Sequence, residues 1–256
     1  MLKKFFVLFF AIVFFSKASF ASSSRNITVF AEPSMAQALT KIARLYSQKN
    51  NVIVSINFNS ALDLMNEVDS GEPADVFISA HSGLVEALRQ KGVVDVYNVS
   101  FIARDEMVLV TSKDNPKILP VLLERKVPFE EAIKILDQNK STLILDHQGN
   151  SSGKFGNDFI SKFNFSDLKL LNKLVEDKTP IITIIKDNPE YYAILFASQI
   201  KSKSDLKILS KTKGQNIFYQ ALVIAGDNME IAREFLKFLK TDKARKILVE
   251  SGFAVD

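Results

Sequence analysis

Hydroxyl side chains recur at the points where predicted strands give way to predicted helices. They are Ser34, Ser60, Ser82, Ser152 and Thr179. In a parallel α/β sheet such junctions lie at the carboxyl edge of the strands, which is where ligands bind. Helix N-termini at this edge present unpaired N–H groups and a positive dipole end, and both favour an anion. A single serine there is explained equally well by helix capping, worth about 1 kcal/mol, so it is the repeated pattern that indicates an anion site.

Histidines and tyrosines offer a second kind of chemistry. The chain has two histidines, His81 and His147, and a tyrosine pair, Tyr191 and Tyr192. A histidine with paired tyrosines resembles the ligand set of periplasmic ferric-binding proteins, so a ferric-iron carrier is one alternative function. The spacing of these four residues matches no compact metal-ligand motif. We therefore expect no metal ligand, with His81 on the rim of a cleft and the tyrosines packed against a sheet.

A secreted serine hydrolase is the alternative from another class of function. Ser34 or Ser152 would be the nucleophile, and His81 or His147 would be the base. Neither serine lies in a G-x-S-x-G elbow, and no carboxylate is evidently placed to orient either histidine. We expect a protein that is not an enzyme and that needs no cofactor.

Alternating strands and helices must position these side chains. In the first part of the chain, hydrophobic periodicity predicts strands over 27–30, 52–58 and 76–78, each followed by a helix. The second part is predicted to contain strands over 107–110, 142–145 and 193–196, and helices over 129–136, through Phe159 and Phe163, and over 181–186. A strand over 221–225 and two helices within 229–249 follow. This alternation is typical of α/β proteins whose sheets are covered by helices.

The first twenty-one residues predict a cleavable export signal. Residues 3–4 are lysines, residues 5–15 are apolar, and residues 19–21 supply a small-x-small cleavage pattern. Eleven apolar residues rise only about 16 Å as a helix, which is short of a bilayer core of roughly 30 Å. We expect residues 1–21 to be removed and the mature protein to work in the periplasm.

The composition excludes several classes of protein. The chain has no cysteine, which excludes a disulfide scaffold, a zinc ribbon, a thiol enzyme and a lipoprotein anchored through a cysteine. The formal net charge of +4 includes three lysines of the signal segment, at positions 3, 4 and 17. Without them, 30 of the 33 basic residues remain against 29 acidic residues, so no basic face for nucleic acid is expected. An anion must therefore be captured by local groups.

Three segments give the chain a family resemblance. They are Thr28-Val29-Phe30-Ala31-Glu32-Pro33-Ser34, Gly71-Glu72-Pro73-Ala74-Asp75-Val76-Phe77-Ile78-Ser79-Ala80 and Ser251-Gly252-Phe253. In this order they resemble the periplasmic molybdate-binding proteins, over nearly the whole mature chain. The resemblance implies a two-lobed α/β fold, the type II periplasmic binding-protein fold, with mixed, mostly parallel sheets covered by helices. It also implies two crossings between the lobes, with residues 26–105 plus 218–256 in lobe 1 and residues 106–217 in lobe 2.

The function implied by the resemblance is that of the substrate-binding protein of an ABC importer. A tetrahedral oxyanion such as molybdate or tungstate would be held in the cleft between the lobes and delivered to an inner-membrane ABC permease. Another small anion bound by the same fold is an alternative. Fixed dipoles in a dehydrated cleft can hold a dianion without a countercharge. We expect a monomer that binds no nucleic acid.

The resemblance also implies which residues bind the anion. The first ligand serine of the family corresponds to Ser34. The second corresponds to Ala61, or to Ser60 one residue earlier. The backbone N–H donor that follows the third strand corresponds to Ala80, and the turn position before a glycine corresponds to Ser152.

Besides Ala61, two positions depart from the pattern of the family and matter more for the ligand. The small apolar position at the start of the fourth helix is Lys178, and the ligand tyrosine is Phe196. Loss of the tyrosine hydroxyl removes one donor to a buried anion, which costs about 1–3 kcal/mol. The ammonium of Lys178 could replace it with a charge-assisted hydrogen bond, and the predicted ligand set includes Lys178 in this role. The alternative is that Lys178 points into solvent.

Overall fold

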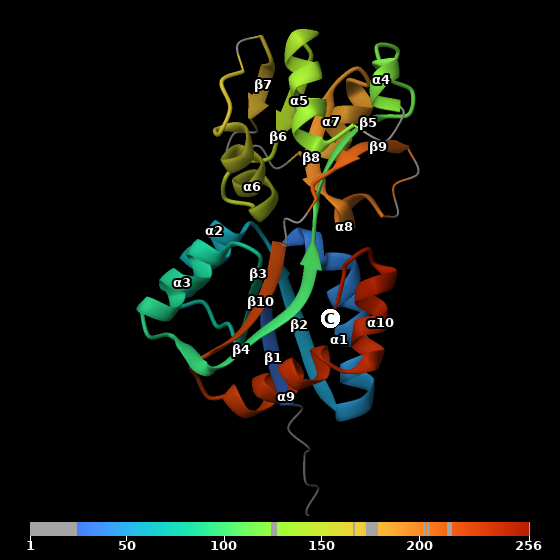
Figure 1. The fold of residues 1–256 in the computed structure, drawn as a ribbon. Coiled ribbons are helices and arrows are strands. Elements are labelled where there is room, and N and C mark those ends of the chain that lie inside the picture. Colours follow the sequence, from blue (N-terminus) through green and yellow to red (C-terminus); the bar gives the residue numbers. More distant parts are fainter. Residues whose placement is uncertain are drawn as a thin grey trace, which may run out of the picture.

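The computed structural model describes residues 25–123, 127–165, 167–172, 179–201, 203, 205–213 and 217–255. The expected signal segment, 1–21, and Lys178 lie outside the described residues. Within them the chain forms two five-stranded sheets, and Figure 1 shows the sheets in separate lobes, one above the other. None of the helices in these ranges is long and apolar enough to cross a membrane.

Five strands build the lower lobe of Figure 1. They are β1 (Arg25–Ala31), β2 (Val52–Phe58), β3 (Val76–Ser79), β4 (Val94–Asp105) and β10 (Ile217–Ile224), in the spatial order β2-β1-β3-β10-β4. Its helical elements are η1 (Pro33–Met35), α1 (Ala36–Asn50), α2 (Ala61–Asp69), α3 (Ser82–Gln90), α9 (Met229–Leu239) and α10 (Asp242–Glu250). Helices lie on both faces of this sheet, so all four residues of the central strand β3 are buried.

Five further strands build the upper lobe. They are β5 (Met107–Ser112), β6 (Thr142–Leu145), β7 (Lys169–Asn172), β8 (Tyr192–Phe196) and β9 (Leu206–Lys211), in the spatial order β7-β6-β8-β5-β9. The helices of this lobe are α4 (Pro120–Leu123), α5 (Phe129–Gln138), α6 (Ser151–Ile160), α7 (Ile181–Asp187) and α8 (Ala197–Ile200). Strands β5 and β8 are buried along their whole length, as β3 is in the lower lobe.

The two sheets have the same mixture of pairings. In the first, β1 pairs with β2 and β3 in parallel, whereas β10 is antiparallel to β3 and β4. In the second, β6 pairs with β7 and β8 in parallel, whereas β5 is antiparallel to β8 and β9. The α/β class and the mixed sheets are therefore confirmed. Parallel pairs make up half of each sheet rather than most of it, because β10 and β5 each insert in the opposite direction.

One of the five hydroxyl residues at strand-to-helix junctions acts as a helix cap. The Oγ of Ser60 accepts the Asp63 N–H at 3.1 Å at the start of α2. The other four lie one or two residues from a cap position: Ser34, Ser82, Ser152 and Thr179. Capping therefore leaves the Ser34 and Ser152 hydroxyls available to other partners.

Buried aromatic side chains connect the two lobes. Phe196 ends β8 in the upper lobe, and Tyr219 lies in β10 of the lower lobe; both are fully buried. Their ring centroids are 6.3 Å apart, and the Tyr219 ring also meets Phe253 at 5.4 Å. These residues belong to one apolar cluster that includes Ala103 and Met107 at the crossing between the lobes. The largest core of the molecule thus extends from one sheet into the other.

The chain changes sheets at two places. It leaves the lower lobe between Asp105, which ends β4, and Met107, which begins β5; Figure 1 shows β4 running up toward the upper lobe. It returns between Lys211, at the end of β9, and Ile217, at the start of β10. Division of the chain into domains at 105/106 and 217/218 stays a prediction, and the strands change sheets near both boundaries.

A buried carboxyl group lies at the first crossing. Asp105 is 7% exposed, and its Oδ1 accepts N–H groups from Glu106 at 2.9 Å and Ser198 at 3.3 Å. Its Oδ2 is buried without a hydrogen-bond partner among the described residues. Burial raises the pKa of Asp105 from 3.8 to about 6 because the charged form is desolvated, although the N–H donors oppose this effect.

The raised pKa of Asp105 makes folding stability depend on pH. The folded state holds this proton more tightly than the unfolded chain, so the contribution is complete below about pH 4 and is lost as the pH rises through about 6. Asp105→Asn abolishes this titration. The free energy of unfolding of this variant relative to wild type should therefore rise by about 2 kcal/mol between pH 4 and pH 7, measured by denaturant titration.

The exposed aspartate Asp227 provides a matched control, because Asp227→Asn removes the same charge from the surface of the same lobe. The difference between the two variants isolates the effect of the buried carboxyl. An Asp105→Asn stability difference that does not change with pH would show that burial does not raise the pKa of this carboxyl.

A close approach of backbone at α6 requires a glycine. A Cβ added to Gly153 would lie 2.0 Å from the His147 carbonyl oxygen and 2.6 Å from that of Asp146. A Cβ on Gly156, one turn later, would meet only the Leu145 side chain at 3.4 Å and that of Ile194 at 3.7 Å. The first turn of α6 can therefore lie this close to the end of β6 only because residue 153 has no side chain.

We expect Gly153→Ala to lower the free energy of unfolding by about 1–3 kcal/mol, because the added methyl group forces α6 away from β6. Gly156→Ala is the matched variant, and its higher helix propensity should offset its tighter packing to within about 1 kcal/mol. Urea denaturation of both variants provides the measurement. Equal stabilities would contradict the close approach at Gly153.

Candidate functional site

A cavity between the lobes is the candidate binding site. Its volume is about 190 Å³. Its polar lining consists of Glu32, Ser34, Asp146, Asn150, Ser152 and Gln199, and its apolar lining includes residues of α7 and β8. These side chains follow the carboxyl ends of β1, β6 and β8, the edge at which α/β sheets bind ligands. The cavity therefore lies where the hydroxyl pattern of the sequence predicted a site.

The side chain of Glu32 joins the two lobes. Its Oε1 accepts the Ser79 hydroxyl at 2.6 Å and the Ala80 N–H at 2.9 Å, both in the lower lobe. From α6 in the upper lobe, the Ser151 hydroxyl donates to Oε1 at 2.7 Å and the Ser151 N–H donates to Oε2 at 3.0 Å. Glu32 is only 2% exposed. A protein carboxylate thus occupies donors of the kind that would hold an oxyanion, including the N–H predicted at Ala80.

Ser34 lies in η1, directly after Glu32 and Pro33, and its hydroxyl oxygen accepts the Tyr219 hydroxyl at 2.7 Å. Burial raises the pKa of Tyr219 well above its usual value, and the nearby charges of Asp105 and Glu32 act in the same direction. The phenol therefore stays protonated and acts as the donor. Because a hydroxyl has one proton and two lone pairs, Ser34 keeps its own proton for a ligand in the cavity.

The turn between β6 and α6 is organised by Asp146. Its Oδ1 accepts the His147 N–H at 3.0 Å, and its Oδ2 accepts the Asn150 amide at 2.8 Å and the Ser152 hydroxyl at 3.0 Å. Ser152 lines the cavity as predicted, but its hydroxyl proton is used within the turn. Ser152 can donate to a ligand only after this hydrogen bond rearranges. The Asn150 amide, which lines the same cavity, is a neighbouring donor.

The remaining predicted ligands of the lower lobe do not line this cavity. The Oγ of Ser60 caps α2, and its N–H donates to Asn59 Oδ1 at 2.9 Å. Ala61 is fully buried as the first residue of α2. The next N–H, of Leu62, crosses to the Gly149 carbonyl of the upper lobe at 3.2 Å. In this conformation the structure therefore brings Ser34 and Ser152 to one cavity and leaves Ser60 and Ala61 beside it, with Ala80 bound to Glu32.

The position of the family's ligand tyrosine is apolar and enclosed. Phe196 is fully buried, 6.1 Å from the ring of Phe155 and 6.3 Å from that of Tyr219. Its neighbour Leu195 is the β8 residue that lines the cavity. Lys178, the predicted compensating donor, lies outside the described residues, so its role stays a prediction.

Both histidines support loops. His81 caps α3 by accepting the Leu84 N–H at Nδ1, 3.3 Å away, and His147 accepts the Gly149 N–H at Nδ1, 3.1 Å away. Burial lowers the pKa of His81, although the Glu32 charge opposes this shift. Across the described part of the chain, no three His, Cys, Asp or Glu side chains form a possible metal site. The structure adds no support to the ferric-binding alternative.

Within the described ranges, neither candidate nucleophile of the hydrolase alternative is hydrogen-bonded to a histidine. Ser34 pairs with Tyr219 and Ser152 pairs with Asp146, so the hydrogen bonds of both candidate nucleophiles go to groups other than a histidine. A nucleophilic serine needs a base within hydrogen-bond reach.

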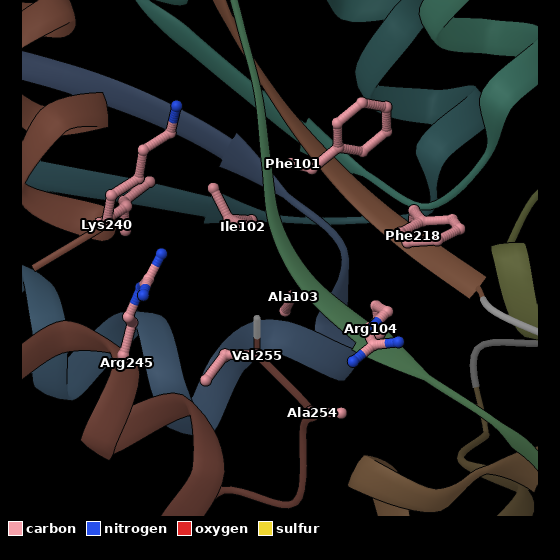
Figure 2. Close-up of a pocket in the computed structure, with 10 residues that line it drawn as sticks. Phe101, Ile102, Ala103, Arg104, Phe218, Lys240, Arg245, Ala254 and Val255 are labelled. Atoms are coloured by element: carbon pink, nitrogen blue, oxygen red, sulfur yellow. The ribbon is translucent and has the colours of Figure 1, made fainter. Parts of the chain in front are cut away.

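A second hollow, on the lower lobe, is smaller. It lies beside the edge strand β4, and Figure 2 shows Lys240 and Arg245 extending toward it from the C-terminal helices, with Phe101 and Phe218 across β4. Its volume is about 50 Å³, which is room for a few water molecules. The cavity between the lobes collects polar groups from both sheets, so it is the better candidate.

Several contributors to the cleft were not predicted from the sequence: the lining side chains of Glu32, Asp146, Asn150 and Gln199, and their partners Ser151 and Tyr219. Glu32 lies inside the segment that carried the family resemblance, where a charged residue at a strand end was the available signal. Ser151 directly precedes the predicted Ser152. Tyr219 gave no local signal, because its role depends on contact with a residue 185 positions away.

Known proteins resemble this chain in sequence and in fold. The family model for bacterial extracellular solute-binding proteins matches residues 27–254. The molybdate-binding protein ModA of Haemophilus influenzae is 25% identical over 254 residues, and the match covers 92% of each chain. The resemblance to the molybdate-binding proteins is thereby confirmed.

Solved structures share the fold at lower identity. The substrate-binding domain of a putative molybdenum ABC transporter from Clostridium difficile is 21% identical with a TM-score of 0.68, covering 91% of this chain and 100% of that one. The tungstate ABC transporter structure from Geobacter sulfurreducens is 16% identical with a TM-score of 0.70, covering 88% and 97%. Likeness at this level shows the fold, and it confirms the type II binding-protein fold.

Proposed function

Because this chain belongs to the family of bacterial extracellular solute-binding proteins, we propose that it is the substrate-binding component of an ABC importer. Its solute is a tetrahedral oxyanion of the type bound by the molybdate and tungstate proteins that it resembles. The solute is held in the cavity between the lobes and is passed to a permease in the inner membrane.

The observation that carries this proposal is the convergence of neutral donors from both lobes on one cavity. The lower lobe contributes the Ser34 hydroxyl, and the upper lobe contributes the Asn150 amide and the first turn of α6. Fixed dipoles in a site closed to water stabilise an anion strongly, and they select it by size and donor geometry. The N-terminal end of α6 adds a favourable dipole.

Location and assembly follow from the same proposal. The expected signal over 1–21 directs the chain to the periplasm, where a binding protein collects solute for its transporter. The protein acts as a monomer, with a permease as its protein partner, and it performs no chemistry on the solute. The binding proteins among its relatives support this role.

Ser34→Ala tests the site directly. Loss of its hydroxyl should weaken oxyanion binding by about 1–3 kcal/mol, measured by calorimetric titration with an oxyanion panel. The substitution also removes the hydrogen-bond acceptor of the buried Tyr219 hydroxyl, so the protein should lose stability at the same time. In a Tyr219→Phe background this second cost disappears, and a loss of affinity caused by Ser34→Ala must then come from the ligand. Undiminished affinity in that background would remove Ser34 from the site.

Substitutions at Lys178 and Phe196 test whether the lysine replaces the hydroxyl donor that the family's tyrosine would supply at position 196. Lys178→Ala and Lys178→Gln should each weaken oxyanion binding at least tenfold, about 1.4 kcal/mol, because a charge-assisted hydrogen bond is lost. Phe196→Tyr in the Lys178→Ala background should restore part of the affinity by supplying a hydroxyl donor. Titration calorimetry measures all three variants. If both Lys178 variants keep full affinity, the lysine makes no contact with the ligand.

A further inference from the structure

The carboxylate of Glu32 holds donors that an oxyanion would need. It accepts the Ser79 hydroxyl and the Ala80 N–H from the lower lobe, and the hydroxyl and N–H of Ser151 from the upper lobe. The first two lie at the end of β3, and the other two lie in the first turn of α6. Neutral donors fixed on both sides of a cleft are the kind that stabilise an oxyanion. A carboxylate is itself an oxyanion, so Glu32 occupies this set in the way that a ligand would.

An oxyanion cannot use these donors while Glu32 holds them. The side-chain donors that line the cavity and remain available, among the described residues, belong to Ser34, Asn150 and Gln199. A dianion beside the buried carboxylate would also be repelled, because the low dielectric of a closed cleft screens little. Both difficulties disappear if the Glu32 side chain leaves. Its four donors then pass to the ligand, and they include the Ala80 N–H that the family resemblance predicted.

Separation of the lobes would allow Glu32 to leave. The carboxylate belongs to the lower lobe, directly before η1, and only its two bonds to Ser151 cross to the upper lobe. Glu32 is 2% exposed, and a buried charge is tolerated only while hydrogen bonds replace its hydration. Opening of the cleft breaks the Ser151 bonds and supplies water to the carboxylate. The side chain can then turn away from Ser79 and Ala80 without remaining buried and unpaired.

We propose that Glu32 is an intramolecular competitor of the ligand: its carboxylate holds the cleft shut in the ligand's place, and the incoming oxyanion displaces it and takes over its donors. This inference rests on the proposed function and deepens it, because it concerns the regulation of the same site. The cleft closes around the internal carboxylate or around the solute, but not around both. The apparent affinity for the solute is then reduced by the fraction of molecules in which Glu32 has left its donors.

Calorimetric titration of the mature chain with molybdate and tungstate measures the competition. Glu32→Ala frees all four donors, so it should bind each anion about tenfold or more tightly than wild type does. Glu32→Gln keeps the shape of the side chain but turns an amide NH₂ toward the Ser151 N–H, so it should also bind more tightly than wild type. Affinities of both variants at or below the wild-type value would overturn the proposal.

Small-angle X-ray scattering separates displacement from simple charge repulsion. Wild type should keep the same radius of gyration with and without saturating molybdate, because either Glu32 or the ligand holds the lobes together. Glu32→Ala should be more expanded on its own and should contract when molybdate is added. Contraction of wild type on binding would overturn the proposal, and this measurement needs no variant. A Glu32→Ala protein with the wild-type radius on its own would also overturn it, because Glu32 would then act only as a repelling charge.

Glu86→Ala is the matched control, because Glu86 is an exposed glutamate of α3 in the same lobe and outside the cavity. It should match wild type in both affinity and radius of gyration. If wild type binds molybdate or tungstate and Glu32→Ala binds no more tightly, only the competition by Glu32 is wrong. If neither wild type nor Glu32→Ala binds molybdate, tungstate or sulfate, the proposed function itself is wrong. The two failures are therefore distinguishable.

Discussion

A buried carboxylate holds the end of β1 in the lower lobe against the first turn of α6 in the upper lobe. Burying a charge is costly unless hydrogen bonds replace its hydration, and Glu32 has such replacements from both sheets. Its position follows from the sequence, because Pro33 starts η1 directly after β1 and leaves the preceding side chain at the strand end. The group that joins the lobes is thus also the group that sets the electrostatic character of the cavity between them.

The surroundings of this carboxylate are arranged to keep it in place. Tyr219 remains a protonated donor because it is fully buried near two acidic groups, and it orients Ser34 on one side of Glu32. Asp146 orders the turn that presents Ser151 on the other side. Gly153 lets that turn approach β6 closely. Each contact is modest in energy, but together they position the first turn of α6 relative to η1.

Much of the fold could be predicted from local pattern, whereas the site could be predicted only in part. The strands over 52–58 and 142–145 have the predicted bounds, because their apolar residues alternate or run together between turn residues. Strands β4, β7 and β9 were missed, because these edge strands carry exposed or charged side chains, such as Tyr97 and Lys207, that hide the periodicity. Ser34 and Ser152 follow from strand-end position, but the partners of Glu32 lie up to 119 residues away, beyond any local signal.

The position of β10 has a consequence for the order of folding. This strand lies in the middle of the lower sheet, between β3 and β4, although it follows the whole upper lobe in the chain. The upper sheet uses one continuous stretch and can assemble from contacts that are closer in sequence. Contacts between distant residues form slowly, because their loops must close first. We therefore expect the upper lobe to fold as a local unit. The lower lobe is completed only when β10 inserts, so a chain that ends before residue 217 lacks the strand that joins β3 to β4.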